Sequence, residues 1–225
     1  MSNKRVIGIG GVARAGKDTF ATILINKLEA AGKTVRRVAL ADPLKHHCNE
    51  FLVNNLGISG FTQIPEEKLI IRPFLVWYGG AQRTRTEGRY WIDLASKTIN
   101  QSKYDYYVIT DIRYDVYQRD ELYWLKTEWS GDLVHISRWT KNMLPESVLD
   151  IAKEFQSRGV IKNLYSRDFV SPANDHEREN DPKIKSASDF IVEWENVENK
   201  TVAELAEDES LIAHVDEFIL DRKLV

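Results

Sequence analysis

The chain has 225 residues, of which 43% are hydrophobic and 29% charged, and its formal net charge is −3. This length suits one domain with a sizeable core, and the composition is that of an ordinary globular protein. A weakly acidic chain is not built to coat nucleic acid, so we expect no direct nucleic-acid binding. The single cysteine excludes an internal disulfide. Neither a signal-peptide pattern nor an apolar run of membrane-spanning length is present, which predicts a cytoplasmic protein without membrane contact.

The first 40 residues predict a strand, a glycine-rich loop, a helix and a second strand. Residues 4–10, KRVIGIG, form a short apolar run that ends in glycine, as a buried strand does. From Lys17 the pattern becomes helical until Gly32 closes it, with four apolar residues on one face: Phe20, Ile23, Leu24 and Leu28. Residues 34–40 predict the second strand. This order implies a parallel sheet with a crossover helix.

The rest of the chain predicts three more strands, at 106–110, 132–137 and 189–194. Residues 42–100 are predicted to be mostly helical, with breaks at Pro43, Pro65, Pro73 and Gly79-Gly80. A helix is expected over 115–128, and another from Thr201 towards the C-terminus. The sequence therefore predicts a single α/β domain over residues 1–225.

Residues 139–187 differ from this pattern. They are polar, contain three prolines, and carry the charged stretch NDHERENDPKIK. Such composition is typical of surface segments outside the packed core. We therefore expect a mobile loop region here.

The stretch GVARAGKDTF, residues 11–20, nearly matches the phosphate-binding P-loop G-x-x-x-x-G-K-[ST]. Gly11, Gly16 and Lys17 hold the motif's positions, between the predicted strand and helix. The backbone N–H groups of such a loop converge on one point, and the helix N-terminus adds partial positive charge, which suits a phosphate. The alternative is a glycine-rich turn with Asp18 in the first helical turn, where the helix dipole favours an acid.

Asp18 stands where the motif has the Ser or Thr that normally holds magnesium. A carboxylate there could bind Mg²⁺ through a water molecule or accept a hydrogen bond from substrate. Thr19 offers a hydroxyl one residue later and is the predicted metal ligand. Because Mg²⁺ keeps most of its waters, either arrangement is tolerable.

A second constellation, ITDIRYD, follows the strand predicted at 106–110. Asp111 and Arg113 fall at the carboxyl edge of the sheet, where open α/β sheets bind ligands. An Asp there can orient magnesium or substrate, and an Arg can contact a phosphoryl group in forked geometry. The alternative is a solvated turn. Phosphoryl transfer needs further cations, and several arginines lie between the predicted strands: Arg72, Arg83, Arg85, Arg89, Arg138 and Arg178.

Several stretches, in chain order, resemble tailed-phage deoxynucleoside monophosphate kinases. GVARAGKDTFA resembles that family's P-loop, in which G-K-D-T is the usual form, and LADPLKHHCNEFL resembles its A-D-P-L-K segment. RPFLVWYGGAQRTR resembles its R-x-x-L-Q-x-L-G-T-E segment, and RYWIDLASKTINQSKYDYYVITDIRYD its Y-W-x-x-x-L segment with D-x-R. NDHERE resembles an H-x-S-E lid element more loosely. The similarity runs from residue 6 to about residue 180.

The resemblance implies a three-layer P-loop kinase fold, with a five-stranded parallel sheet between helices. It implies a monophosphate-binding insert at 42–100 and a lid at 139–187. The implied reaction transfers the γ-phosphoryl group of Mg-ATP to a deoxynucleoside monophosphate (dNMP), with ATP and Mg²⁺ as cofactors. The family also implies a homodimer, and a location in the host cytoplasm if the protein is encoded by a phage.

The resemblance also implies roles for individual residues. The donor would be held by the loop residues Gly11, Arg14, Ala15, Gly16, Lys17, Asp18 and Thr19. The acceptor would be held by Asp42, Lys45, Arg72, Gly79, Arg85, Trp91 and Asp111, with Trp91 as a stacking surface for the base. We expect the catalytic residues to be Lys17, Asp18, Arg113 and Arg138, of which Arg138 is chosen because it follows the strand predicted at 132–137 and not by a match to the family.

The chain departs from the family pattern in the third of these segments. Val76 replaces the family's Gln, and Gly79-Gly80-Ala81 replaces its G-T-E turn. The arginine that follows the turn aligns with Arg83 or Arg85. These departures leave the preferred base open.

Three other functions remain alternatives. Another small-molecule P-loop kinase, of the phosphomevalonate or dephospho-coenzyme A type, would share Lys17 and the D-x-R but lack a base-stacking Trp91. A nucleotide-gated ATPase or switch would hydrolyse ATP without an acceptor. A non-catalytic nucleotide-binding module is the third, and an intact Lys17 argues against it.

Overall fold

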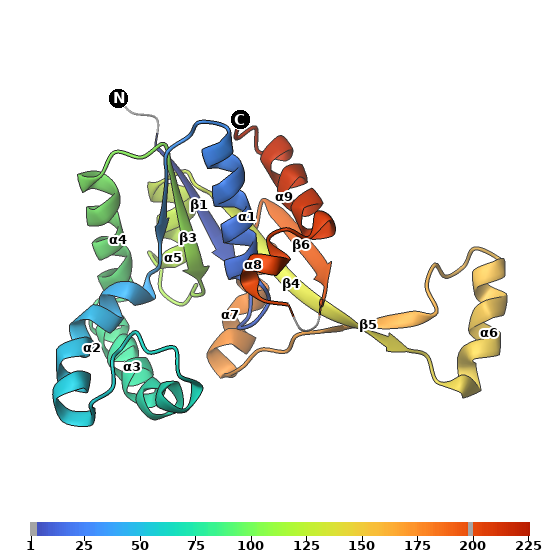
Figure 1. Cartoon of the computed structure of the whole chain (residues 1–225), viewed down its shortest axis with the longest axis horizontal. Coiled ribbons are helices and arrows are strands. Elements are labelled where there is room, and N and C mark those ends of the chain that lie inside the picture. The colour runs from blue at the N-terminus through green and yellow to red at the C-terminus, as the bar shows by residue number, and fades with distance from the viewer. Residues whose placement is uncertain (1–3, 198–199) are drawn as a thin grey trace.

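The computed structural model describes residues 4–197 and 200–225, and it is built around a sheet of six strands with helices on both faces (Figure 1). The strands are β1 (Arg5–Gly10), β2 (Val35–Val38), β3 (Tyr106–Ile112), β4 (Asp132–Met143), β5 (Tyr165–Phe169) and β6 (Phe190–Glu195). Their order is β2, β3, β1, β4, with β5 and β6 both paired to β4. All pairs are parallel except β4 with β5. The α/β class and all five predicted strands are confirmed, whereas β5 was not predicted.

Each face of the sheet buries its own apolar cluster. Helices α1 (Lys17–Ala30) and α9 (Glu209–Asp221) cover one face, where Ile7, Phe20 and Phe218 meet. The other face carries α4 (Arg89–Gln101), the π-helix η1 (Trp124–Glu128) and α7 (Asp175–Ser186), packed through Val6, Trp124 and Ile184. Val6 and Ile7 point to opposite faces because side chains alternate along a strand. The two clusters hold the carboxyl ends of β1, β3 and β4 side by side.

The insert between β2 and β3 is helical, as predicted, but with fewer breaks. It consists of α2 (Ala41–Leu56), α3 (Pro65–Arg85) and α4. The breaks predicted at Pro73 and Gly79-Gly80 are wrong, since both lie inside α3. Pro43 lies in the first turn of α2, where a missing N–H costs nothing, and Pro65 starts α3. Packing of Ile71 and Gly79 against α2 keeps α3 continuous.

The prediction of an irregular loop over residues 139–187 is wrong. Strand β4 runs past the sheet and pairs with β5 from Trp139↔Phe169 to Met143↔Tyr165, and α6 (Glu146–Ser157) lies between these two strands. Figure 1 shows this arm, residues 139–169, projecting away from the body before α7 returns to it. The arm has solvent on both faces, so its strands lack the apolar alternation of a half-buried strand.

Two other predicted helices are shorter than expected. The helix predicted at 115–128 begins only at α5 (Glu121–Tyr123), because the Asp120 carboxylate accepts the N–H groups of Val116 and Tyr117 and holds a turn there. The C-terminal helix is divided into α8 (Val202–Leu205) and α9 by Asp208, which caps α9. Among residues 4–197 and 200–225, no helix combines the length and apolar character that a membrane crossing requires.

Candidate active site

The P-loop connects β1 to α1 in a conformation that depends on its glycines. Gly11 has φ 131° and Gly16 has φ 96°, both in the left-handed region that favours glycine. A Cβ on Gly11 would lie 2.3 Å from the carbonyl oxygen of Ile136, and one on Gly16 would lie 2.3 Å from the Trp194 ring. Larger residues would therefore force the loop away from β4 and β6.

The loop presents backbone donors. Ala15 N–H bonds to the carbonyl of Val12, whereas the N–H groups of Gly16, Lys17 and Asp18 find no acceptor among the described residues. These three N–H groups belong to the first turn of α1 and its N-cap, where the helix dipole is positive. This is the arrangement that binds phosphate at helix N-termini.

Lys17 folds back over its own loop. Its Nζ donates to the carbonyl oxygens of Gly11 at 2.7 Å and Val12 at 2.8 Å, and the residue is only 8% exposed. Burial, assisted by the charge of Arg113, lowers the pKa of Lys17 to about 8. A desolvated ammonium held against carbonyl dipoles is a strong attractor for an incoming anion.

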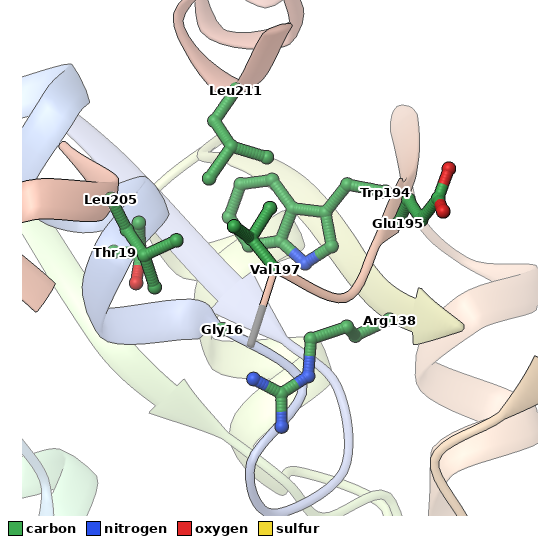
Figure 2. A pocket seen from close by; sticks show the side chains of 8 residues that line it. All are labelled: Gly16, Thr19, Arg138, Trp194, Glu195, Val197, Leu205 and Leu211. Atoms are coloured by element: carbon green, nitrogen blue, oxygen red, sulfur yellow. The ribbon is translucent and has the colours of Figure 1, made fainter. Parts of the chain in front are cut away.

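Asp18 and Thr19 lie in different environments. The Asp18 carboxylate is exposed and forms an ion pair with Arg37 of β2. Thr19 is 3% exposed and lies in an apolar hollow with Trp194 and Leu205, as Figure 2 shows. Thr19 therefore does not fit the predicted role of a magnesium ligand, whereas the accessible Asp18 carboxylate fits a water-mediated one. The described residues contain no group of three or more His, Cys, Asp or Glu arranged around a metal.

Asp111 positions the insert. Its two carboxylate oxygens accept the N–H groups of Leu40 at 2.7 Å and Ala41 at 3.0 Å, at the start of α2. Burial raises the pKa of Asp111, while Arg113 and these two hydrogen bonds oppose the rise. Asp111 thus joins the sheet edge to the insert that carries most of the predicted acceptor residues.

Arg113 points towards α7, where it meets a carboxylate that the sequence did not single out. Its NH1 lies 3.6 Å from Oε1 of Glu177. Oε2 of Glu177 accepts the N–H of Ala13 in the P-loop at 3.2 Å and that of Ala173 at 2.9 Å, and Glu177 is 8% exposed. Glu177 and Ala13 are separated by 164 positions in the chain. Only the folded structure brings them together.

Two arginines, Arg14 in the loop and Arg138 beside it, add positive charge here. Arg138, on β4, extends its guanidinium past Gly16 (Figure 2), and its Nε is buried without a hydrogen-bond partner. Burial, followed by the charge of Arg14, lowers the pKa of Arg138. Within the described residues neither arginine forms an ion pair. Two neighbouring cations of this kind are stabilised when an anion binds between them.

The charged residues predicted to hold the acceptor on α2 and α3 are accessible. Lys45 Nζ lies 4.0 Å from the carboxylate of Asp42 and 5.8 Å from the ring centroid of Phe61. Arg72 is exposed on α3 and has no side-chain partner among the described residues. Gly79 is buried, and a Cβ there would lie 3.3 Å from Leu44 of α2, so its small size lets the two helices approach.

Trp91 and Arg83 are structural residues in this fold. Trp91 is 5% exposed and its indole N–H donates to the carbonyl of Gly79 at 3.2 Å, so its face is not open for the predicted base stacking. Arg83 is buried between Asp120 and Glu121. Of the two arginines that the sequence left open, Arg85 is therefore the one that remains available to a ligand; it is exposed and bonds to Gln82 within its own helix.

Trp194, which was not predicted as a site residue, supports the P-loop from strand β6. Trp194 of β6 donates its indole N–H to the carbonyl of Ala15 at 2.9 Å. With Gly16, Arg138 and Val197 it lines a shallow hollow next to the P-loop (Figure 2). Nothing in the stretch DFIVEW distinguished this tryptophan from an ordinary core residue.

No protein-family model and no curated protein sequence matches this chain. Solved structures that align with it include shikimate kinase from Acinetobacter baumannii in complex with shikimate, at 14% identity and a TM-score of 0.42, over 100% of this chain and 97% of that one. APS kinase from Mycobacterium tuberculosis, in complex with AMPPNP and APS, aligns at 14% identity and a TM-score of 0.40, over 96% and 99% respectively. A gluconokinase from Sinorhizobium meliloti aligns at 12% identity and a TM-score of 0.32, over 100% and 98%. Similarities of this size do not define a substrate or a reaction for this chain.

Proposed function

We propose that this chain is a P-loop phosphotransferase that moves the γ-phosphoryl group of Mg-ATP to a deoxynucleoside monophosphate, giving a dNDP and ADP. The observation that carries the proposal is the loop itself. N–H groups without an acceptor among the described residues lie together with the buried Lys17 at the carboxyl end of β1; the charge of Arg113 acts on Lys17, and that of Arg14 acts on Arg138. The order of the sequence motifs supports the choice of a nucleotide acceptor.

The donor nucleotide would occupy the P-loop. The N–H groups of Gly16, Lys17 and Asp18 would hold its β-phosphate, and Lys17 would exchange its carbonyl contacts for oxygens of the β- and γ-phosphates. The nucleoside end would extend from the loop on the side of Arg138. Asp18 would hold Mg²⁺ through water. There Mg²⁺ would supply positive charge that offsets the charge of the donor's phosphates.

The acceptor would lie between the insert and the loop. Lys45, Arg72 and Arg85 provide accessible cations on α2 and α3 for its phosphate, with Asp42 beside them for its sugar. Asp111 would fix the insert relative to the loop through its cap on α2. Gly79 and Trp91 would shape the wall of this site rather than stack on the base.

Transfer itself would depend on charge and position. An acceptor phosphate is already an anionic nucleophile, so no general base is required. Arg113 and Arg138 would neutralise charge on the phosphoryl group during its transfer, which is the main catalytic need of this reaction. The arm and α7 would act as the lid, and closing the lid would exclude water and so protect ATP from hydrolysis.

The test is ADP release from Mg-ATP with each of the four dNMPs as acceptor, and a blank without acceptor. Release that depends on one or more acceptors is the expected result and would identify the preferred base. Release in the blank alone would favour an ATPase. The absence of release, from protein that still binds ATP, would contradict the proposed acceptor.

The burial of Trp91 favours a second candidate, a small-molecule P-loop kinase whose acceptor is not a nucleotide. Such an enzyme needs no base-stacking surface. It would use the same loop, Lys17 and Arg113. Adding phosphomevalonate and dephospho-coenzyme A to the acceptor panel distinguishes it, since ADP release would then depend on one of these and on no dNMP.

A further inference from the structure

Helix α7 is docked on the body through polar contacts at successive turns. Asn180 Oδ1 accepts the N–H of Asp115 at 3.1 Å, Asp181 lies 3.0 Å from Nε2 of the buried His135, and Lys185 lies 2.9 Å from Glu193. Its one fully buried apolar side chain among the described residues is Ile184. A helix with so little apolar burial is weakly held by the hydrophobic effect.

Glu177, at the start of this helix, has the surroundings of a bound phosphate. Its carboxylate accepts a P-loop N–H, from Ala13, and faces the guanidinium of Arg113, with Lys17 close enough for its charge to act on both. Backbone N–H groups of a phosphate loop combined with arginine and lysine are the donors that bind phosphoryl oxygens. Here a carboxylate of the chain itself occupies two of these donors, the N–H of Ala13 and the guanidinium of Arg113.

Helix capping explains only part of this geometry. Glu177 is the third residue of α7, and its bond to the N–H of Ala173 is a local capping contact. Its hydrogen bond to Ala13 and its ion pair with Arg113 join α7 to distant segments, which a cap does not require. The negative charge at this point would repel an incoming phosphate.

The contact between α7 and the sheet is incompletely filled. A cavity of about 160 Å³ lies between α7, β4 and the end of β5, next to the P-loop. Its lining includes Val12, His135, Phe169 and Asp181. A poorly filled contact of this kind lowers the cost of shifting the helix.

We infer that, before a nucleotide binds, the Glu177 carboxylate occupies one side of the P-loop anion site, at the N–H of Ala13 and the guanidinium of Arg113, and that a nucleotide phosphate displaces it. Displacement would release the first turn of α7 and, through residues 170–174, the arm that precedes it. Glu177 therefore makes lid movement depend on occupation of the loop. The inference rests on the proposed function only in that the loop must bind phosphate.

The test is calorimetric titration with inorganic pyrophosphate in the absence of divalent cations. Glu177→Gln keeps the hydrogen-bond acceptor but removes the charge. Glu179→Gln is the matched control, because it makes the same charge change two residues away at an exposed position of the same helix. We expect Glu177→Gln to bind pyrophosphate about tenfold more tightly than the wild type, and Glu179→Gln to bind like the wild type.

A change in pyrophosphate affinity in the opposite direction would overturn the inference. Equal or weaker binding by Glu177→Gln would mean that Glu177 supports the site, for example as a ligand of a phosphate-bound cation. If the wild type and all variants fail to bind pyrophosphate, the phosphate loop and the proposed function fail with it. If the wild type binds pyrophosphate and Lys17→Ala does not, the loop binds phosphate. The affinity of Glu177→Gln then tests the displacement of Glu177 separately from the proposed function.

A second measurement does not depend on a variant. In the wild type, pyrophosphate should speed hydrogen exchange at the amide of Ala173, because its acceptor leaves when Glu177 is displaced. Unchanged or slower exchange at Ala173, with pyrophosphate bound, would contradict displacement.

Discussion

Arg83 and Arg138 lie in opposite electrostatic environments. Arg83 donates to Asp120 at 2.8 and 2.7 Å and to Glu121 at 2.9 Å, and its guanidinium carbon lies 3.8 Å from the ring centroid of Tyr114. The Nε of Arg138 is buried and has no hydrogen-bond partner in the part of the chain that the structure describes, and the like charge of Arg14 acts on this guanidinium. Arg83 connects α3 to the segment after β3, whereas the guanidinium of Arg138 lies beside the loop and remains able to bind an anion.

This difference distinguishes an arginine that stabilises the fold from one that can bind a ligand. A buried arginine whose donors are satisfied by carboxylates has no capacity left for a ligand, and removing it leaves buried charges without a partner. An arginine near another cation is destabilised until an anion arrives. Changes at Arg83 should therefore affect the stability of the fold, and changes around the P-loop should affect phosphate chemistry.

Lys17→Ala should have the largest effect. It removes the ammonium that would hold the transferring phosphate, so we expect kcat to fall at least about a thousandfold. The far-ultraviolet circular dichroism spectrum should not change, because Lys17 Nζ donates only to carbonyl oxygens of its own loop, those of Gly11 and Val12. Turnover close to the wild-type rate would refute the mechanism.

Arg83→Met should instead lower the free energy of unfolding by about 3 kcal/mol, since Asp120 and Glu121 would stay buried without their cation. Chemical denaturation measures this directly. Arg85→Met, two residues along the same helix and exposed, is the control and should change stability by less than about 0.5 kcal/mol. Equal losses in the two variants would remove the distinction between paired and free arginines.

Arg138→Gln should reduce kcat/KM for the proposed reaction by about ten- to a hundredfold, as expected for loss of one charged contact to the phosphoryl group. Its melting temperature should stay the same or rise, because a cation near Arg14 is removed. A fall in melting temperature without a change in kcat/KM would place Arg138 with Arg83 as a structural residue.

The pH dependence of phosphate binding should be the smallest effect. The pKa of Lys17 lies at about 8, below its usual value, so its charge is lost as the pH rises through 8. Only the charged form attracts phosphate, and affinity for pyrophosphate should therefore be level below pH 7 and fall about tenfold by pH 9. Lys17→Arg, which keeps its charge, should show no such fall; the same fall in that variant would exclude Lys17 as the titrating group.

The sequence predicted the parts of the fold that have one buried face. The five parallel strands and α1 follow from apolar patterning, and the P-loop from its glycines and lysine. The arm could not be predicted this way because solvent surrounds both of its faces. The breaks expected at Pro73 and Gly79 failed because tertiary packing against α2 outweighs local propensity.

Candidate site residues could be proposed from the sequence only where they are close together in the chain. The P-loop and the pair Asp111 and Arg113 are local motifs, and they do lie at one edge of the sheet. Glu177 and Trp194 reach the loop only through tertiary structure, and no local signal marks them. Trp91 was predicted to stack on a base but is buried. The local sequence does not distinguish a tryptophan that packs in the core from one that stacks on a base.

The most direct test of the account follows the phosphoryl group itself. ATP labelled at the γ-phosphate is incubated with the protein, magnesium and each dNMP, and the products are separated by thin-layer chromatography. The account predicts that the label moves to a dNDP in at least one mixture and that Lys17→Ala abolishes this transfer. Label recovered only as inorganic phosphate, equally with and without acceptor, would contradict it.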